Sequence, residues 1–192
     1  MRTILFIIID VSGSMNEMGK IYLQRNLCRY ASQLQIMEPE KYSNFEIRFF
    51  QWAENISEIA IQSDGDIPAL ISEGRSDLIA LSSFLSDRQN DGQILRVIVL
   101  SDGNFSDSDV SNFKKQLRTI PDLPLRTVAI GADVNLLKLK KISSNDSVYL
   151  PENISSAIDS TVFNTEKHPA VPEFTSQILQ TKQVEPGEDW DV

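Results

Sequence analysis

Three short segments of the sequence carry closely spaced carboxylate and hydroxyl side chains. In the first, Asp10-Val11-Ser12-Gly13-Ser14, one carboxylate and two hydroxyls alternate directly after an apolar run. The second is Gly74-Arg75-Ser76-Asp77, and the third is Asp102, which follows the apolar run 97–100. Oxygen ligands of this kind suit a hard cation such as Mg²⁺, and Gly13 is expected to let the backbone curl so that both hydroxyls converge. The segments therefore predict a magnesium site.

The elements that must position these residues can be read from the hydrophobic pattern. Apolar runs of strand length alternate with amphipathic stretches of helix length, which is typical of a parallel sheet with crossover helices. Asp10 and Asp102 each follow such a run, and open α/β sheets bind ligands where their strands end. The predicted strands are 3–9, 45–52, 56–61, 95–101, 125–130 and 148–150, and the predicted helices are 20–37, 76–85, 107–117, 135–142 and 153–162.

The predicted fold class is α/β: a Rossmann-like, doubly wound and mostly parallel sheet with helices on both faces. Only three residues separate the strands 45–52 and 56–61, which predicts a hairpin and hence one antiparallel edge strand. Trp52 is expected to be buried, and Cys28 is expected to be a small core residue of the first helix, on the same side as Met37. Asp107 or Ser108 and Asn153 are the expected helix N-caps.

The three segments together resemble the von Willebrand factor A (VWA) domain family. Its metal-ion-dependent adhesion site (MIDAS) combines Asp-x-Ser-x-Ser with a Thr or Ser and a later Asp, and here Ser76 lies 62 residues beyond Ser14, with Asp102 a further 26 residues on. The resemblance covers roughly residues 3–162. It implies the VWA fold, with the ion bound by the hydroxyls of Ser12, Ser14 and Ser76, and with Asp10 and Asp102 acting directly or through water.

One segment departs from the family pattern. The family usually has Gly-Gly-Thr where this sequence has Gly74-Arg75-Ser76, so Asp77 competes with Ser76 for the third ligand position. The alternative role for Ser76 is a helix N-cap. Mg²⁺ is the expected ion, with Mn²⁺ or Ca²⁺ as alternatives.

The resemblance implies a protein-binding module and not an enzyme, in which a Glu or Asp of a partner displaces a water from the ion. The chain is most similar to small bacterial intracellular VWA proteins of the tellurium-resistance-associated type, which implies a stress or signalling adaptor whose partner is a protein kinase or a PP2C-type phosphatase. An adaptor of an AAA+ ATPase is the alternative. A Mg²⁺-dependent phosphohydrolase with Asp10 as nucleophile, and an extracellular adhesion protein, are further alternatives.

Charge and composition exclude several classes of partner, metal site and location. The chain has 192 residues, with 18 Lys and Arg against 27 Asp and Glu, so its formal charge of −9 argues against nucleic acid as a partner. One cysteine and one histidine, His168, provide no zinc-type cluster. No stretch is long and apolar enough to cross a membrane, and the first apolar run stops at Asp10 without a cleavage site, so a cytoplasmic location is expected.

The periodic pattern ends near Asn164, which predicts a VWA domain at 1–164 and an acidic, proline-containing tail at 165–192. Residues 166–192 carry six acids against two lysines, and Trp190 has no core to join, so this tail is a candidate docking peptide. Two basic runs in the predicted domain are interpreted as solvated faces that could dock an acidic partner: Lys114, Lys115 and Arg118, and Lys138, Lys140 and Lys141.

Overall fold

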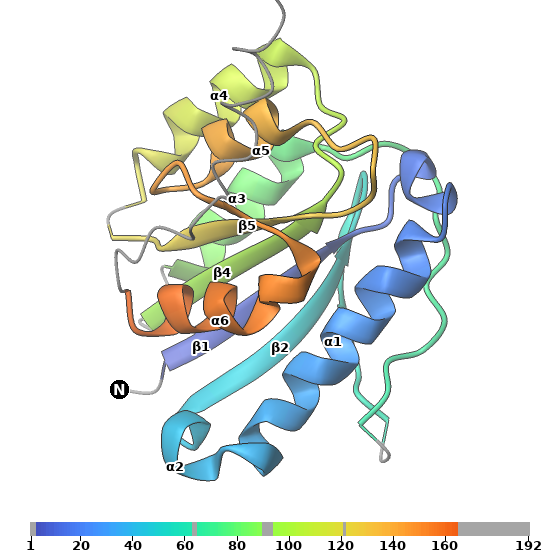
Figure 1. Ribbon diagram of the computed structural model, residues 1–192. Coiled ribbons are helices and arrows are strands. Elements are labelled where there is room, and N and C mark those ends of the chain that lie inside the picture. The colour runs from blue at the N-terminus through green and yellow to red at the C-terminus, as the bar shows by residue number, and fades with distance from the viewer. Residues whose placement is uncertain (1–2, 63–64, 90–93, 121, 165–192) are drawn as a thin grey trace, which may run out of the picture.

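The computed structural model describes residues 3–62, 65–89, 94–120 and 122–164 (Figure 1). The predictions for the tail, including Trp190 and His168, lie outside these residues. The described residues form a six-stranded sheet in the order β3-β2-β1-β4-β5-β6. Its strands are β1 (Thr3–Asp10), β2 (Phe45–Trp52), β3 (Ile56–Ile59), β4 (Ile94–Ser101), β5 (Leu125–Ala129) and β6 (Val148–Tyr149).

The sheet has the topology expected from the sequence. β1 lies between β2 and β4 and pairs in parallel with both, while β3 pairs antiparallel with β2 at the edge. The central strands β1 and β4 are almost continuously buried, as their uninterrupted apolar runs predict. β3 ends at Ile59, short of the predicted Ile61, which is 41% exposed. Because β1 and β4 are parallel neighbours, Asp10 and Asp102 are delivered to the same end of the sheet.

The helices are α1 (Lys20–Met37), α2 (Pro39–Tyr42), α3 (Leu78–Gln89), α4 (Asp107–Leu117), α5 (Leu136–Ile142) and α6 (Ile154–Val162), with short 3₁₀ turns η1 (Gly13–Asn16) and η2 (Pro151–Asn153). All five predicted helices are present, whereas α2 and the two 3₁₀ turns were not predicted. α2 begins at Pro39, a favourable residue for a first helical turn because its missing N–H needs no partner there.

Two local predictions were wrong, and a third was confirmed in part. The N-cap of α4 is Ser106, whose Oγ accepts a hydrogen bond from the backbone N–H of Asp109 at 3.1 Å. Asn153 is the N-cap residue of α6 as predicted, but its side chain makes no capping hydrogen bond. Met37 is 62% exposed, because it is the last residue of α1 and extends past the sheet that the helix covers.

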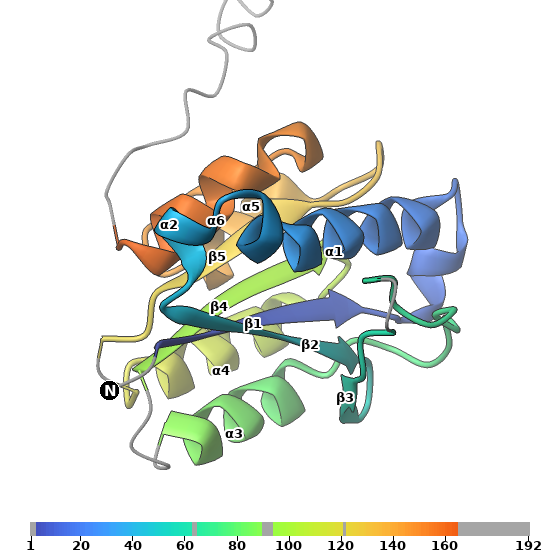
Figure 2. The ribbon, with the colours of Figure 1, turned by 90° about the horizontal axis from the view of Figure 1, so that it is seen from below.

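Helices cover both faces of the sheet (Figures 1 and 2). α1 and α6 pack with one face of the sheet in one apolar cluster, and α3, α4 and α5 pack with the other face in a second cluster. Cys28 belongs to the first cluster and Trp52 to the second, and both are fully buried as predicted. Among the described residues, no helix combines the length and the apolarity that crossing a membrane requires.

Candidate metal site

Asp10 lies at the centre of the candidate site, at the last position of β1, and is fully buried. Its Oδ1 accepts hydrogen bonds from the backbone N–H of Ser12 and from Ser76 Oγ, both at 2.9 Å. Its Oδ2 accepts from Ser76 Oγ at 2.9 Å and from Ser101 Oγ at 2.6 Å. Burial raises the pKa of Asp10, while these hydrogen bonds lower it. The net result is a raised pKa, because burial destabilises the charged form of the carboxylate. A cation bound beside Asp10 would offset this cost.

The two hydroxyls of the first segment converge as predicted. Ser12 Oγ and Ser14 Oγ lie 3.3 Å apart. The cause is the 3₁₀ turn η1, in which the N–H of Met15 donates to the carbonyl of Ser12 at 2.9 Å. Gly13 does not adopt a left-handed conformation, and a Cβ there would lie 3.4 Å from the carbonyl oxygen of Gly74, close to ordinary van der Waals contact.

Ser76, and not Asp77, faces the site. Ser76 Oγ contacts both carboxylate oxygens of Asp10, whereas Asp77 Oδ1 accepts hydrogen bonds from the N–H groups of Ile79 and Ala80 at the start of α3. Asp77 is therefore the helix cap, a role that the sequence analysis had considered for Ser76. The segment is fixed to the first one because the N–H of Gly13 donates to the carbonyl of Gly74 at 2.9 Å.

Asp102 follows β4 and is 3% exposed. Its Oδ1 accepts from the N–H of Asn104 at 3.0 Å, and its Oδ2 accepts from Lys20 Nζ at 2.9 Å. Lys20 Nζ also donates to the carbonyl of Ser14 at 3.3 Å. Lys20 thus links Asp102 to Ser14, which contacts Ser12, while Ser12 and Ser76 both donate to Asp10. All five predicted residues therefore belong to one hydrogen-bonded network, to which Ser101 adds a further contact with Asp10.

Lys20 is a site residue that the sequence analysis missed. It is 1% exposed at the first position of α1, and its Nζ also donates to Asp133 Oδ2 at 2.7 Å. Space for it depends on Gly131, where a Cβ would lie 2.6 Å from Lys20 Cε and the φ of +97° favours glycine. A signal existed, since a cation at a helix N-terminus opposes the helix dipole and needs a compensating anion.

The side chains present fit a hard divalent cation by their chemistry. The site offers carboxylate and hydroxyl oxygens alone, from Asp10, Ser12, Ser14, Ser76 and Asp102, and these are the ligand types that Mg²⁺ and Mn²⁺ accept. The described residues bring together no three His, Cys, Asp or Glu side chains that could hold an ion, so the hydroxyls are essential to the candidate site. The ammonium group of Lys20 already provides one positive charge beside Asp102.

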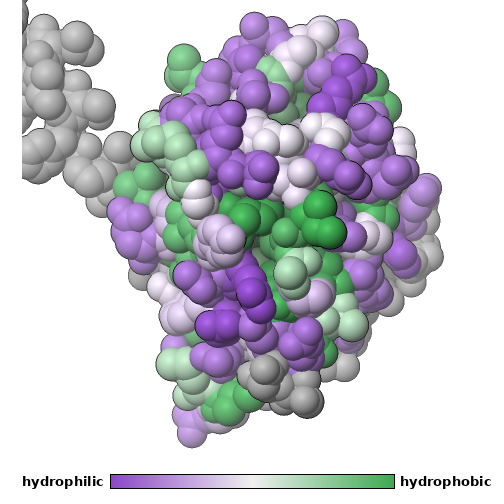
Figure 3. Space-filling model, turned by 90° about the vertical axis from the view of Figure 1, so that its right-hand side faces the viewer, coloured by the Kyte–Doolittle hydropathy of each residue, from purple (hydrophilic) through white to green (hydrophobic). Residues whose placement is uncertain are grey.

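The candidate site opens on the end of the molecule where the strands finish, which Figure 3 shows as a polar face with an apolar area near its centre. A cavity of about 620 Å³ adjoins the site and is lined by Val11 and Gly74 together with Glu54, Glu73 and Ile71. Ile71 and Met18, which lie on the loops before Gly74 and after η1, are 73% and 74% exposed.

No family model matches the sequence, and a search of curated proteins finds no match. Solved structures do match the fold. They include the ArnB paralogue VWA2 of Sulfolobus acidocaldarius, with a TM-score of 0.62, 19% identity, and coverage of 80% of this chain and 43% of that one. A von Willebrand factor type A protein of Catenulispora acidiphila matches with a TM-score of 0.55, 16% identity, and coverage of 81% and 41%.

Two further matches are metal-bound. Proximal thread matrix protein 1 from the mussel byssus, with zinc in its MIDAS motif, has a TM-score of 0.60, 13% identity, and coverage of 84% of this chain and 45% of that one. Manganese-loaded TRAP of Plasmodium vivax has a TM-score of 0.60, 14% identity, and coverage of 84% and 73%. At these identities the matches establish the fold, which is that of VWA domains. This chain spans less than half the length of the first two structures.

Proposed function

We propose that this VWA-fold domain is a metal-dependent protein-binding module, which holds a divalent cation at the end of β1 and β4. The observation that carries the proposal is the buried Asp10 carboxylate, placed among hydroxyls whose positions follow the MIDAS order. Zinc and manganese in matching structures support a divalent ion in this fold. Mg²⁺ is the ion proposed here, with Mn²⁺ or Ca²⁺ as alternatives, because the ligand oxygens are hard.

The serines and the aspartates would have different roles in binding the ion. Ser12, Ser14 and Ser76 would hold the ion with neutral hydroxyls, and Asp10 and Asp102 would supply negative charge directly or through water. When bound, the ion supplies an incompletely neutralised positive charge that a carboxylate of a partner can approach. Lys20 reduces the negative charge that Asp102 can offer, since its ammonium group already contacts that carboxylate at 2.9 Å. This arrangement favours an external Glu or Asp as a ligand.

The finer proposals rest on the sequence resemblance. We propose a cytoplasmic adaptor of a bacterial stress, tellurium-resistance or kinase and phosphatase system, with a protein kinase or a PP2C-type phosphatase as the partner. An adaptor of an AAA+ ATPase is the alternative.

A phosphohydrolase that uses Asp10 as nucleophile has less support. Asp10 is fully buried, and both its carboxylate oxygens accept hydrogen bonds from Ser76, with Ser101 and the N–H of Ser12 as further donors. A nucleophile needs a free oxygen and access to substrate. The geometry instead suits a carboxylate that orients hydroxyl ligands.

The proposal is tested by calorimetric titration of Mg²⁺ and Mn²⁺ into the full chain and into Ser12→Ala/Ser14→Ala. The matched control is Ser106→Ala/Ser108→Ala, because these serines have the same spacing and a hydroxyl contact of 2.8 Å at the exposed start of α4. We expect the first pair to abolish metal binding and the control pair to retain it. No metal binding by the wild type, or equal binding by all three proteins, would refute the proposed site.

The partner is sought by affinity capture with Mg²⁺ or with EDTA, using the wild type and the Ser12→Ala/Ser14→Ala variant, and by identification of captured proteins with mass spectrometry. A partner of the proposed kind is captured by the wild type in Mg²⁺ alone. Replacement of its contacting Glu or Asp by Gln or Asn must then abolish capture.

A further inference from the structure

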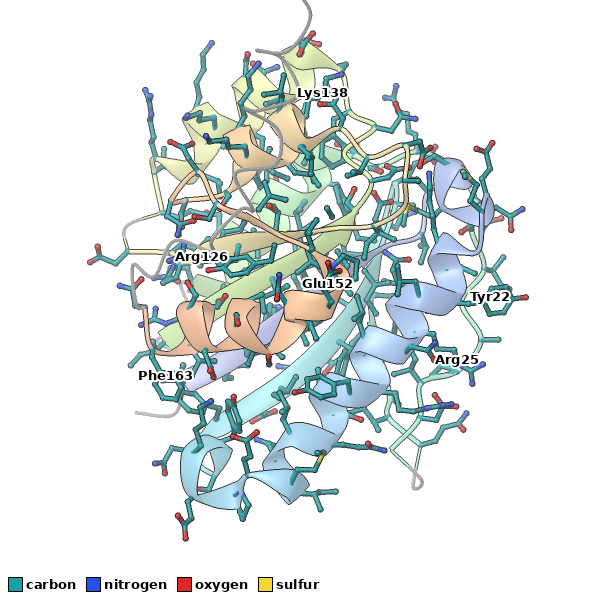
Figure 4. The ribbon with its side chains drawn as sticks, in the orientation of Figure 1. Tyr22, Arg25, Arg126, Lys138, Glu152 and Phe163 are labelled. Atoms are coloured by element: carbon teal, nitrogen blue, oxygen red, sulfur yellow. The ribbon has the colours of Figure 1, made fainter. Side chains whose placement is uncertain are left out.

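A second pocket lies at the opposite end of the sheet from the candidate metal site. It has a volume of about 600 Å³ and opens where β4 and β5 begin, between the end of α4 and the loop that follows α5. In Figure 4, Arg126 of this pocket is labelled on the side where the strands start, far from Tyr22 near the start of α1. The volume is within the range of about 300–1,000 Å³ typical of small-molecule sites.

The lining of this pocket is strongly basic. Five cationic side chains from four helices and strands line it, against two carboxylates, Asp122 and Asp146, in a chain whose formal charge is −9. The five cationic residues are Arg96, Lys114, Arg118, Arg126 and Lys141. The basic runs that the sequence analysis interpreted as solvated faces thus contribute Lys114, Arg118 and Lys141 to one concave surface.

The structure holds one of these guanidinium groups in place. Arg126 is 2% exposed, and its Nη1 donates to Ser144 Oγ at 2.7 Å while its Nε donates to Ser160 Oγ at 3.2 Å. A buried guanidinium fixed by serine hydroxyls is already ordered before any ligand arrives. Binding to it therefore costs less conformational entropy than binding to an exposed lysine.

A second guanidinium lacks a partner for one of its donors. Arg96 Nε is buried and has no hydrogen-bond acceptor among the described residues, while Nη1 donates to the carbonyl of Leu95 at 3.3 Å. Leaving a buried donor of a charged group unsatisfied is costly. Lys114, Arg118 and Lys141 form no ion pair within the described part of the chain. An anion in the pocket would compensate the positive charges of these side chains.

We propose that this pocket binds a small phosphorylated ligand, whose phosphate oxygens accept hydrogen bonds from Arg96 and Arg126 and face the ammonium groups of Lys114 and Lys141. Guanidinium groups match phosphate geometry because they donate two parallel hydrogen bonds. The ligand is small because the cations are confined to a pocket, whereas a nucleic acid requires an extended positive surface. This site is independent of the candidate metal site.

The test uses inorganic pyrophosphate as the probe, titrated calorimetrically into the full chain in EDTA so that divalent ions contribute nothing. We expect the wild type to bind with a dissociation constant of about 1 mM or tighter. Lys114→Gln/Lys141→Gln should weaken binding at least about tenfold, since it removes two of the charged donors.

The matched control is Lys115→Gln/Lys140→Gln, which removes the same charge from the same helices at exposed lysines that do not line the pocket. It should change the affinity by no more than about twofold, because only screened long-range attraction is lost. Absence of pyrophosphate binding by the wild type overturns the proposal. Equal weakening by both double variants also overturns it, because it would show binding to net charge and not to the pocket.

Discussion

Replacement of Lys20 by Met tests the balance of charge between Lys20 and Asp102 in the candidate metal site. Lys20 and Asp102 are 1% and 3% exposed and form a buried ion pair with an N–O distance of 2.9 Å. Removing one partner of a buried pair costs about 3–5 kcal/mol, because the other charge stays buried without compensation. The second partner, Asp133, has a side chain that is 48% exposed, and its contact adds about 0–1 kcal/mol.

These values give an expected change in melting temperature. In EDTA, Lys20→Met should melt about 6–24 °C below the wild type, since 1 kcal/mol corresponds to about 2–4 °C in a protein of this size. Saturating Mg²⁺ should recover much of the loss, because the ion then neutralises Asp102 in place of the ammonium group. The metal-induced rise in melting temperature should therefore be larger in Lys20→Met than in the wild type.

The assay is thermal unfolding followed by circular dichroism, with EDTA or with Mg²⁺. The control is Lys41→Met, which breaks another lysine–aspartate pair, with Asp159 at 2.7 Å, whose side chains are 37% and 35% exposed. It should cost about 0–1 kcal/mol and leave the metal response unchanged. An identical metal-induced rise in Lys20→Met and the wild type would refute the argument that Lys20 competes with the ion for Asp102.

Three further predictions concern single residues. Gly131→Ala should lower the free energy of unfolding by about 1–3 kcal/mol in urea, because its φ of +97° and its 2.6 Å approach to Lys20 Cε leave no room for a Cβ; an unchanged value would contradict this. Cys28 is fully buried, and burial raises the pKa of its thiol, so a thiol reagent should label it only after unfolding; rapid labelling of the folded protein would show that it is accessible. Burial raises the pKa of Tyr42 to about 12. The unfolded chain therefore loses this proton first, and the free energy of unfolding should fall as the pH rises above about 10; Tyr42→Phe should remove that part of the pH dependence, and an equal loss in both proteins would refute the assignment.

Much of the fold could be predicted from the sequence because the signals are local. The uninterrupted apolar runs of β1 and β4 give buried parallel strands, and a carboxylate after each run places Asp10 and Asp102 at one end of the sheet. The hairpin of β2 and β3 follows from its short connection. The convergence of Ser12 and Ser14 also follows from a local turn.

The missing parts of the site depend on contacts between distant segments. Lys20 meets Asp102 across 82 positions of sequence and Asp133 across 113, and no local pattern specifies such a pairing. Ser101 was predicted as the end of a strand, yet its hydroxyl donates to Asp10 because the neighbouring parallel strand β1 ends at the same level. The choice of Ser76 over Asp77 as the ligand also required the fold, since the side chains of both residues carry oxygen ligands at the same point of the sequence.

Loop main-chain hydrogen bonds join the segments of the candidate metal site in two groups. Two main-chain hydrogen bonds join the segments that carry Ser12 and Ser76. The N–H of Gly13 donates to the carbonyl of Gly74, and the N–H of Glu73 donates to the carbonyl of Val11, both at 2.9 Å. Asp102 belongs to the other group, because its carbonyl accepts a hydrogen bond from the N–H of Asn135, at the start of α5, at 2.8 Å. A displacement of Asp102 would therefore act on α5 directly, and it would reach the serine segments only through side chains such as Lys20, which contacts both Asp102 and the carbonyl of Ser14. This hydrogen bond links the segment that carries Asp102 to the start of α5, on the face of the sheet that α3 and α4 also cover.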